Sequence, residues 1–101
     1  MNKIQLAINK IEQRIKDKNL SVDQIENLSN NLTLDLEEHA KCQELKSLMF
    51  AMGRLSQDDA QQLYKILGDT PMQFESRSLA EKTVAMTIYQ EMLEMKVAGK
   101  I

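Results

Sequence analysis

Glycine and proline occupy only four positions of this 101-residue chain, and each position suits the end or the start of a helix. Gly53, Gly68 and Gly99 each follow a run of helix-forming residues, where glycine readily takes the left-handed conformation that ends a helix. Pro71 follows Thr70 and suits the first position of a short helical turn. The sequence therefore predicts an all-α fold, a compact bundle of four or five helices with short capped loops.

The length of the chain limits it to one small domain, which we expect to span residues 1–101. Its longest apolar run covers residues 48–52, far short of the roughly 20 residues that a membrane-spanning helix needs. The first residues also lack the apolar block of a secretory signal. We therefore expect a cytoplasmic protein that makes no membrane contact.

Isoleucines recur at helical spacing near the N-terminus and predict a helix over about residues 2–18 with one narrow apolar stripe: Ile4, Ile8, Ile11 and Ile15. Such a stripe suits either packing within the domain or pairing with a second copy. The same helix carries most of the basic side chains of the N-terminal part. They form either a modest basic stripe for a partner or an ordinary solvated face of the helix. These basic residues are Lys3, Lys10, Arg14, Lys16 and Lys18.

Start signals divide the rest of the chain into further helices. Ser21 and Ser78 each begin a capping box, with Gln24 and Glu81 three residues later. A long helix begins after Thr33 or Asp35 and ends at Gly53, and the next begins after Ser56 and ends at Gly68. The last helix is expected to run from Ser78 to about Val97.

The last helix has an apolar band that covers well over half of its circumference, and methionine is abundant in it. Such a helix is either central in the bundle or in contact with a partner. Methionine fills gaps in cores, but it is also frequent at adaptable binding surfaces. We predict a homodimer with this helix at the contact, and take as candidate partner-binding residues Met86, Tyr89, Met92, Leu93 and Met95.

Acidic residues gather at two predicted helix starts and form a second set of candidate partner-binding residues: Asp35, Glu37, Glu38, Asp58 and Asp59. Together with Glu44 they could imitate a phosphate track for a basic partner. Their place at helix N-termini also explains them as caps and as charges that complement the helix dipole. Both interpretations stay open at the level of sequence.

The chain offers little material for catalysis or metal binding. It has one cysteine and one histidine, so it forms no internal disulfide and lacks a usual zinc-ligand set. Glu38, His39 and Cys42 share one helix face, but no glycine-rich loop or further ligand accompanies them. We therefore expect no catalytic residue, no metal and no cofactor, and a protein that is not an enzyme.

DNA binding is the alternative function, because two helices around Gly53 superficially resemble a helix-turn-helix. The charge argues against it. The would-be recognition helix begins Ser56-Gln57-Asp58-Asp59, which would place carboxylates against phosphates. The few aromatic residues also give single-stranded nucleic acid little to stack on.

Residues 34–75 carry a set of short motifs: Glu38-His39-Ala40, Gln43, Lys46-Ser47, Gly53, Leu55, Asp59-Ala60-Gln61, Tyr64, Leu67-Gly68, and Thr70-Pro71 with Phe74. In these the chain resembles a group of short helical proteins encoded by phages, prophages and plasmids. The resemblance implies a mobile-element accessory protein, which in that group often acts by binding a host protein. It carries over no catalytic residue.

These features together favour a non-enzymatic protein–protein interaction module. With the resemblance, the interpretation becomes a phage or mobile-element accessory protein. Such a protein would bind and inhibit or redirect a host protein complex, such as a defence system, in the host-cell cytoplasm. A small helix-turn-helix-like DNA-binding regulator remains the alternative.

Overall fold

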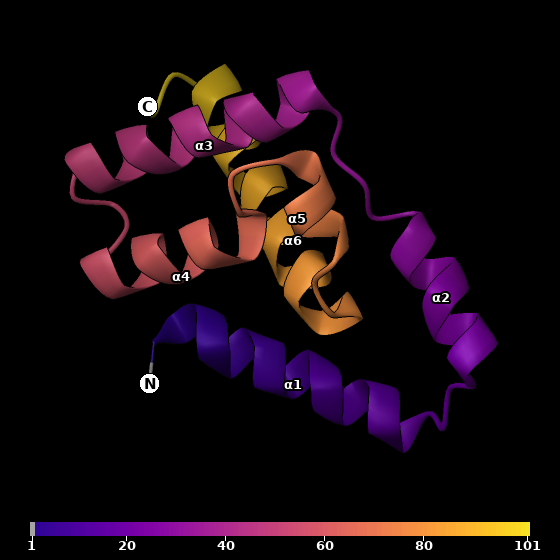
Figure 1. Ribbon diagram of the computed structural model, residues 1–101. Coiled ribbons are helices and arrows are strands. Elements are labelled where there is room, and N and C mark those ends of the chain that lie inside the picture. The colour runs from indigo at the N-terminus through magenta and orange to yellow at the C-terminus, as the bar shows by residue number, and fades with distance from the viewer. Residues whose placement is uncertain (1) are drawn as a thin grey trace.

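The computed structural model describes residues 2–101 and is built from helices joined by short connections (Figure 1). The elements are α1 (Lys3–Asp17), α2 (Val22–Asn30), α3 (Leu36–Ala51), α4 (Gln57–Leu67), α5 (Pro71–Glu75) and α6 (Leu79–Val97). No strand occurs among these residues, which confirms the all-α class. Six helices are present where four or five were expected, and α5 is the five-residue helical turn that the proline predicted.

Local capping chemistry starts the helices where the sequence predicts. Ser21 and Ser78 form complete capping boxes at α2 and α6, and Ser56 caps α4. At α3 the cap is Asp35 and not Thr33. Its carboxylate accepts the N–H of Glu38 at 2.7 Å, so two groups at the helix start satisfy each other.

Glycines with positive φ angles lie at the ends of α3, α4 and α6, namely Gly53, Gly68 and Gly99. Gly53 follows the C-cap residue of α3 and has φ +72°. The N–H of Arg54 reaches back to the carbonyl of Met49 at 2.9 Å, which is the Schellman arrangement. Gly68 differs from the expectation: it is itself the C-cap of α4, with φ +68° and ψ −173°, a region that only glycine populates freely.

Helix α6 lies at the centre of the bundle and contacts α1, α2, α3 and α4. Helices α3 and α4 run antiparallel, side by side, and α1 crosses below them along α4 and α6 (Figure 1). Helix α2 stands at the edge and packs mainly on α6. A helix with four neighbours needs apolar side chains on most sides, which explains the wide band of α6.

The core joins residues from every helix except α2, which has no fully buried residue. Ile4 and Ile8 of α1 belong to the core, whereas Ile11 and Ile15 are half-buried at its edge. The isoleucine stripe therefore packs within the chain over its first half and stays partly open over its second. The core residues are Ile4, Ile8, Leu34, Cys42, Leu45, Met49, Leu63, Ile66, Leu67, Phe74, Ala80, Val84, Ala85, Tyr89 and Met92.

Side chains from α3 hold the C-terminal end of α4. The ring nitrogen Nε2 of His39 lies 3.0 Å from the carbonyl of Leu67, and the amide of Gln43 donates to the carbonyl of Gly68 at 3.0 Å. The guanidinium of Arg77 donates to the carbonyl of Ile66, also near the end of α4, at 3.1 Å. Carbonyls that the helix leaves without intrahelical partners are thus satisfied by long-range contacts.

Lys82 links α2 and α5 to α6. Its ammonium group donates to the carbonyl of Ser29 at 3.1 Å and to that of Glu75 at 3.3 Å, and it also contacts the hydroxyl of Ser29. The residue is buried, and desolvation lowers its pKa, while the charge of Glu75 opposes that shift. The edge helix α2, which has no fully buried residue, is thus also held by a polar anchor.

Candidate functional site

The apolar band of α6 is mostly part of the core. Met92 is 1% exposed and Tyr89 is 6% exposed, so the helices of this chain cover both residues. Met86, Leu93 and Met95 are half-buried and pack against the same core. The central position of α6 therefore accounts for the band, and Tyr89 and Met92 are not available to a partner in this fold.

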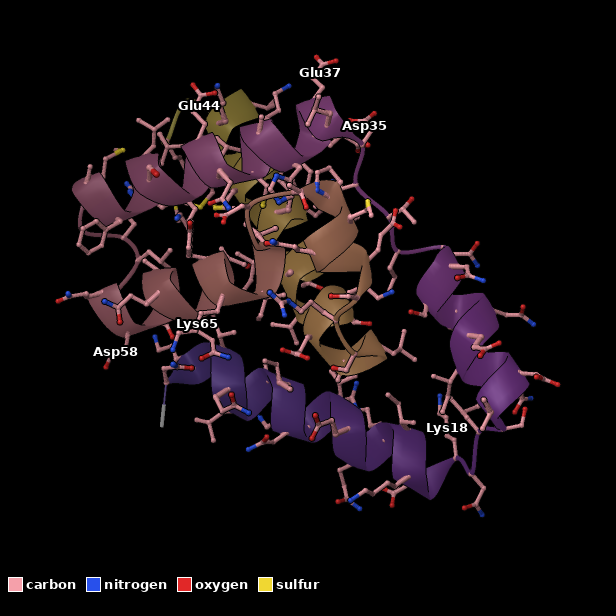
Figure 2. The ribbon with its side chains drawn as sticks, viewed as in Figure 1. Lys18, Asp35, Glu37, Glu44, Asp58 and Lys65 are labelled. Carbon is pink, nitrogen blue, oxygen red and sulfur yellow. The ribbon has the colours of Figure 1, made fainter. Side chains whose placement is uncertain are left out.

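The acidic residues do not form one track. Asp35, Glu37 and Glu38 are exposed at the start of α3, where Asp35 and Glu38 serve each other in the capping box. Figure 2 shows Asp35 and Glu37 on the outer side of α3 and Asp58 at a separate corner of the molecule. Of the two interpretations that the sequence left open, the arrangement favours helix caps over a continuous acidic track.

Asp59 departs furthest from the expectation, because it is buried. Its carboxylate lies 3.5 Å from the backbone nitrogen of Ile4, at the start of α1, and its own N–H donates to the hydroxyl of Ser56. A carboxylate beside a helix N-terminus stabilises the partial positive charge there. Asp59 therefore connects α4 with α1 and does not present its charge to a partner.

An apolar groove runs between α1 and α6, with a volume of about 350 Å³. Its lining comes from Ile4, Ala7 and Ile11 on one side and from Val84 and Ile88 on the other. A second hollow of about 370 Å³ continues it toward α2 and shares Ile11 with the first. We call both hollows together the α1 groove. The residues that line its far part include Ile15, Leu20, Leu28, Leu32 and Leu79.

Basic side chains of α1 border the α1 groove. Lys3, Lys10 and Arg14 line the part next to α6, and Lys18 lines the part next to α2. Figure 2 shows Lys18 at the end of α1 that is nearest α2. The sequence grouped Lys16 with these residues, but the structure places it on another side of α1, in a shallow hollow it shares with Glu12 and Ile25. The acidic residue that lines the groove is Glu91 of α6.

A second surface carries exposed aromatic side chains, and we call it the aromatic face. Phe50 of α3 is 48% exposed and Tyr64 of α4 is 47% exposed, and both line one shallow hollow between the two helices. The remaining lining residues are polar or small, namely Lys46, Gln57, Ala60, Gln61 and Lys65. The two other aromatic residues of the chain, Phe74 and Tyr89, are buried.

Contacts with its neighbours fix the Tyr64 side chain. Its hydroxyl donates to the carboxylate of Asp69 at 2.6 Å, and the ammonium of Lys46 lies 4.6 Å from the centre of its ring. The hydrogen bond to Asp69, and then the negative charge of that residue, raise the pKa of Tyr64. The sequence pointed to Tyr89 as the aromatic residue at a partner contact and not to Phe50 or Tyr64, because nothing local in the sequence shows which aromatic side chains stay exposed.

The surroundings of His39 and Cys42 indicate structural roles for both side chains. His39 is buried and bound to the end of α4, and Cys42 is fully buried. Burial raises the pKa of the Cys42 thiol to about 12, which keeps it protonated and unreactive at neutral pH. Within residues 2–101, no group of three or more histidine, cysteine, aspartate or glutamate side chains is arranged to hold a metal ion.

No protein-family model, curated protein or solved structure matches this chain. The resemblance to proteins of mobile elements therefore stays a prediction from the sequence. In the part of the chain that the structure describes, no helix is both long enough and apolar enough to cross a membrane. The α1 groove and the aromatic face are thus the two candidate binding surfaces of the protein.

Proposed function

We propose that this protein is a non-catalytic interaction module that binds a partner protein through the aromatic face. The observation that carries the proposal is the pair of half-exposed aromatic rings, Phe50 and Tyr64, in one hollow on adjacent helices. Aromatic residues dominate the binding energy of many protein interfaces, where they fill pockets at the centre of the contact. In line with the resemblance, the proposed partner is a host protein, whose complex the binding inhibits or redirects.

The Tyr64 ring is held in place before any partner arrives. Asp69 anchors its hydroxyl and Lys46 lies over its ring. A side chain that is ordered in the free protein loses little conformational entropy on binding, so more of its contact energy contributes to affinity. The long aliphatic stems of Lys46 and Lys65 can extend the apolar contact at the rim.

The DNA-binding alternative would use the same two helices, and their surface charge argues against it. Asp58 is exposed in the first turn of α4, at the end of the helix that would meet the phosphates. DNA binding at physiological salt that is lost when Lys46 and Lys65 are changed to Ala would favour this alternative over the proposal.

The proposal is tested by replacing Tyr64 with a photoreactive phenylalanine derivative in cells that express the protein. The partner protein that becomes crosslinked is identified and then purified in free form. Its affinity for this protein is measured by titration calorimetry. We expect Phe50→Ala and Tyr64→Ala each to weaken binding by about tenfold or more. Leu36→Ala and Met72→Ala are the matched controls, because these side chains are 75% and 79% exposed, at the far end of α3 from Phe50 and on α5, and they should leave affinity unchanged.

Circular dichroism and thermal unfolding verify that the variants stay folded. The proposal is wrong if position 64 yields no specific crosslink, or if the purified partner binds the two aromatic variants as tightly as the wild type. An equal loss of affinity in the Leu36→Ala and Met72→Ala variants would also contradict the proposal.

A further inference from the structure

The basic residues that border the α1 groove form one stripe. Lys3, Lys10, Arg14 and Lys18 follow one another at spacings of seven, four and four residues, which are whole numbers of helical turns to a close approximation. All four are exposed, and each lines the groove. The stripe therefore runs parallel to the apolar floor along the length of α1.

We propose that the α1 groove is a second binding site, which takes an acidic amphipathic helix of a partner protein. An amphipathic helix lays its apolar side into a hydrophobic groove and keeps its charges at the rim. The floor, made of residues such as Ile11, Val84 and Ile88, suits the apolar side of such a helix. The basic stripe suits acidic residues beside that apolar side.

The groove favours a helix over an extended strand. Its walls come from helices α1 and α6 and, at the far end, from α2, and the backbone groups of these helices are already paired within each helix. A strand needs a sheet edge to pair with, and the groove offers none. From Lys3 to Lys18 the stripe spans about 22 Å of helix, which matches a bound helix of about four turns.

The two walls differ in charge, and this fixes the chemistry of the bound helix further. The wall from α1 carries the basic stripe, whereas α6 contributes Glu91 and two threonines, Thr83 and Thr87. Carboxylates of the bound helix should therefore lie on the side next to α1, and neutral or basic residues on the side next to α6. A nucleic acid fits less well, because its phosphates gain nothing from an apolar floor and are repelled by Glu91.

The acidic helix is assigned to another protein and not to a second copy of this chain. Helices α3 and α6 each carry three acidic residues and α2 carries two. All three are engaged within the chain: α3 packs on α4 and α6, α6 is the central helix, and α2 packs on α6, where Lys82 also holds it. A helix whose apolar side is already buried has little to place in the α1 groove.

The experiment is a selection of random peptides of about 16 residues, displayed on yeast, against the purified full chain. We expect the enriched peptides to be amphipathic, to carry several Asp or Glu residues beside the apolar side, and to gain helicity on binding. Their affinities are then measured by fluorescence anisotropy. Binding should weaken as salt is raised, because the charges at the rim are screened.

Variants place the peptides in the groove. Lys10→Glu with Arg14→Glu should weaken binding about tenfold or more, because the reversed charges repel acidic peptides. Lys16→Glu is the matched control, since it changes an exposed lysine of the same helix outside the groove and should have little effect. Thr87→Tyr, at an exposed residue of the α6 wall, should block the groove without changing its basic stripe.

Several results would overturn the proposal. One is the absence of enriched peptides, and another is enrichment of peptides without acidic residues. The third is an equal loss of peptide affinity in the Lys16→Glu control and in the Lys10→Glu, Arg14→Glu double variant. A dimer in sedimentation that the Lys10–Arg14 pair dissociates would assign the groove to a second copy. Duplex DNA bound at about 0.15 M salt through the same residues would assign it to nucleic acid.

The aromatic face serves as the independent reference. Phe50→Ala and Tyr64→Ala should leave peptide binding to the groove unchanged, because these residues lie between α3 and α4 and not along the α1 groove. If the peptide selection fails while a partner still binds at the aromatic face, only the proposal of this second site is therefore refuted.

Discussion

The imidazole of His39 in α3 and the backbone carbonyl of Leu67 at the end of α4 are 3.0 Å apart, inside the protein. Twenty-eight residues separate the two in sequence. The carbonyl can only accept, so the ring nitrogen carries the hydrogen. Together with the hydrogen bond from Gln43 to the carbonyl of Gly68, this contact ties the two helices of the aromatic face together at the end that leads into α5. It thus supports the geometry on which the proposed function rests.

Removing this contact should destabilise the whole domain. We expect His39→Ala to lower the free energy of unfolding by about 1–3 kcal/mol, because it leaves a buried carbonyl without a partner and opens a cavity. Urea unfolding followed by circular dichroism measures the change. Lys41→Ala, at an exposed position of the same helix, should change stability by less than about 0.5 kcal/mol. Equal stability of wild type and His39→Ala would show that the contact contributes nothing.

Alanine should cost more stability at Gly68 than at Gly53. Both residues have positive φ, so alanine is strained by about 1 kcal/mol at Gly53 and by more at Gly68, whose φ and ψ only glycine adopts freely. An added Cβ at Gly53 meets no atom within 4 Å, whereas at Gly68 it would lie 2.6 Å from the Cβ of Gln73. Gly68→Ala should therefore lower the melting temperature clearly more than Gly53→Ala does. The reverse order would contradict the conformation of the α4–α5 connection.

Alkaline pH should weaken the fold partly through Cys42. The unfolded chain loses the thiol proton near the usual pKa of 9.0, whereas burial keeps the folded thiol protonated up to about pH 12. Between these values the unfolded state binds fewer protons than the folded state, so stability falls as pH rises. The contribution is fully present below pH 9 and decreases by at most about 1.4 kcal/mol per pH unit above it.

Cys42→Ala isolates that contribution. Urea unfolding is measured at several values between about pH 8 and pH 10.5 for the variant and for the wild type. The variant should lose stability less steeply over this window, whatever its stability at neutral pH. Identical slopes would show that the thiol titrates alike in both states. A thiol reagent should also label wild-type Cys42 only after unfolding, because the side chain has no exposed surface.

The helices could be predicted because their ends are determined by local chemistry. Ser21, Asp35, Ser56 and Ser78 satisfy backbone groups within three residues of themselves, so the sequence alone identifies them. Gly53 likewise ends α3 through its own φ angle. These signals need no knowledge of the tertiary structure.

The surfaces could not be predicted, because exposure depends on contacts between distant residues. Asp59 resembled Asp58 in sequence, yet a contact with Ile4, 55 residues away, leaves only Asp58 at the surface. The two phenylalanines also differ in exposure, since Phe74 is buried and Phe50 is 48% exposed. The basic residues of α1 were noted in the sequence, and their alignment with an apolar groove became visible only with α6 beside them.

The methionine band of α6, which the sequence predicted to form a homodimer contact, packs mostly inside this chain. Met92 is 1% exposed, so Met92→Glu would place a carboxylate among apolar side chains without a partner. We expect this variant to lose cooperative unfolding and native helicity, which circular dichroism measures. Met72→Glu is the control, because Met72 is 79% exposed on α5 and should tolerate the charge. If Met92→Glu instead yields a folded monomer from a wild-type dimer in sedimentation, the band is a subunit contact and the burial described here is wrong.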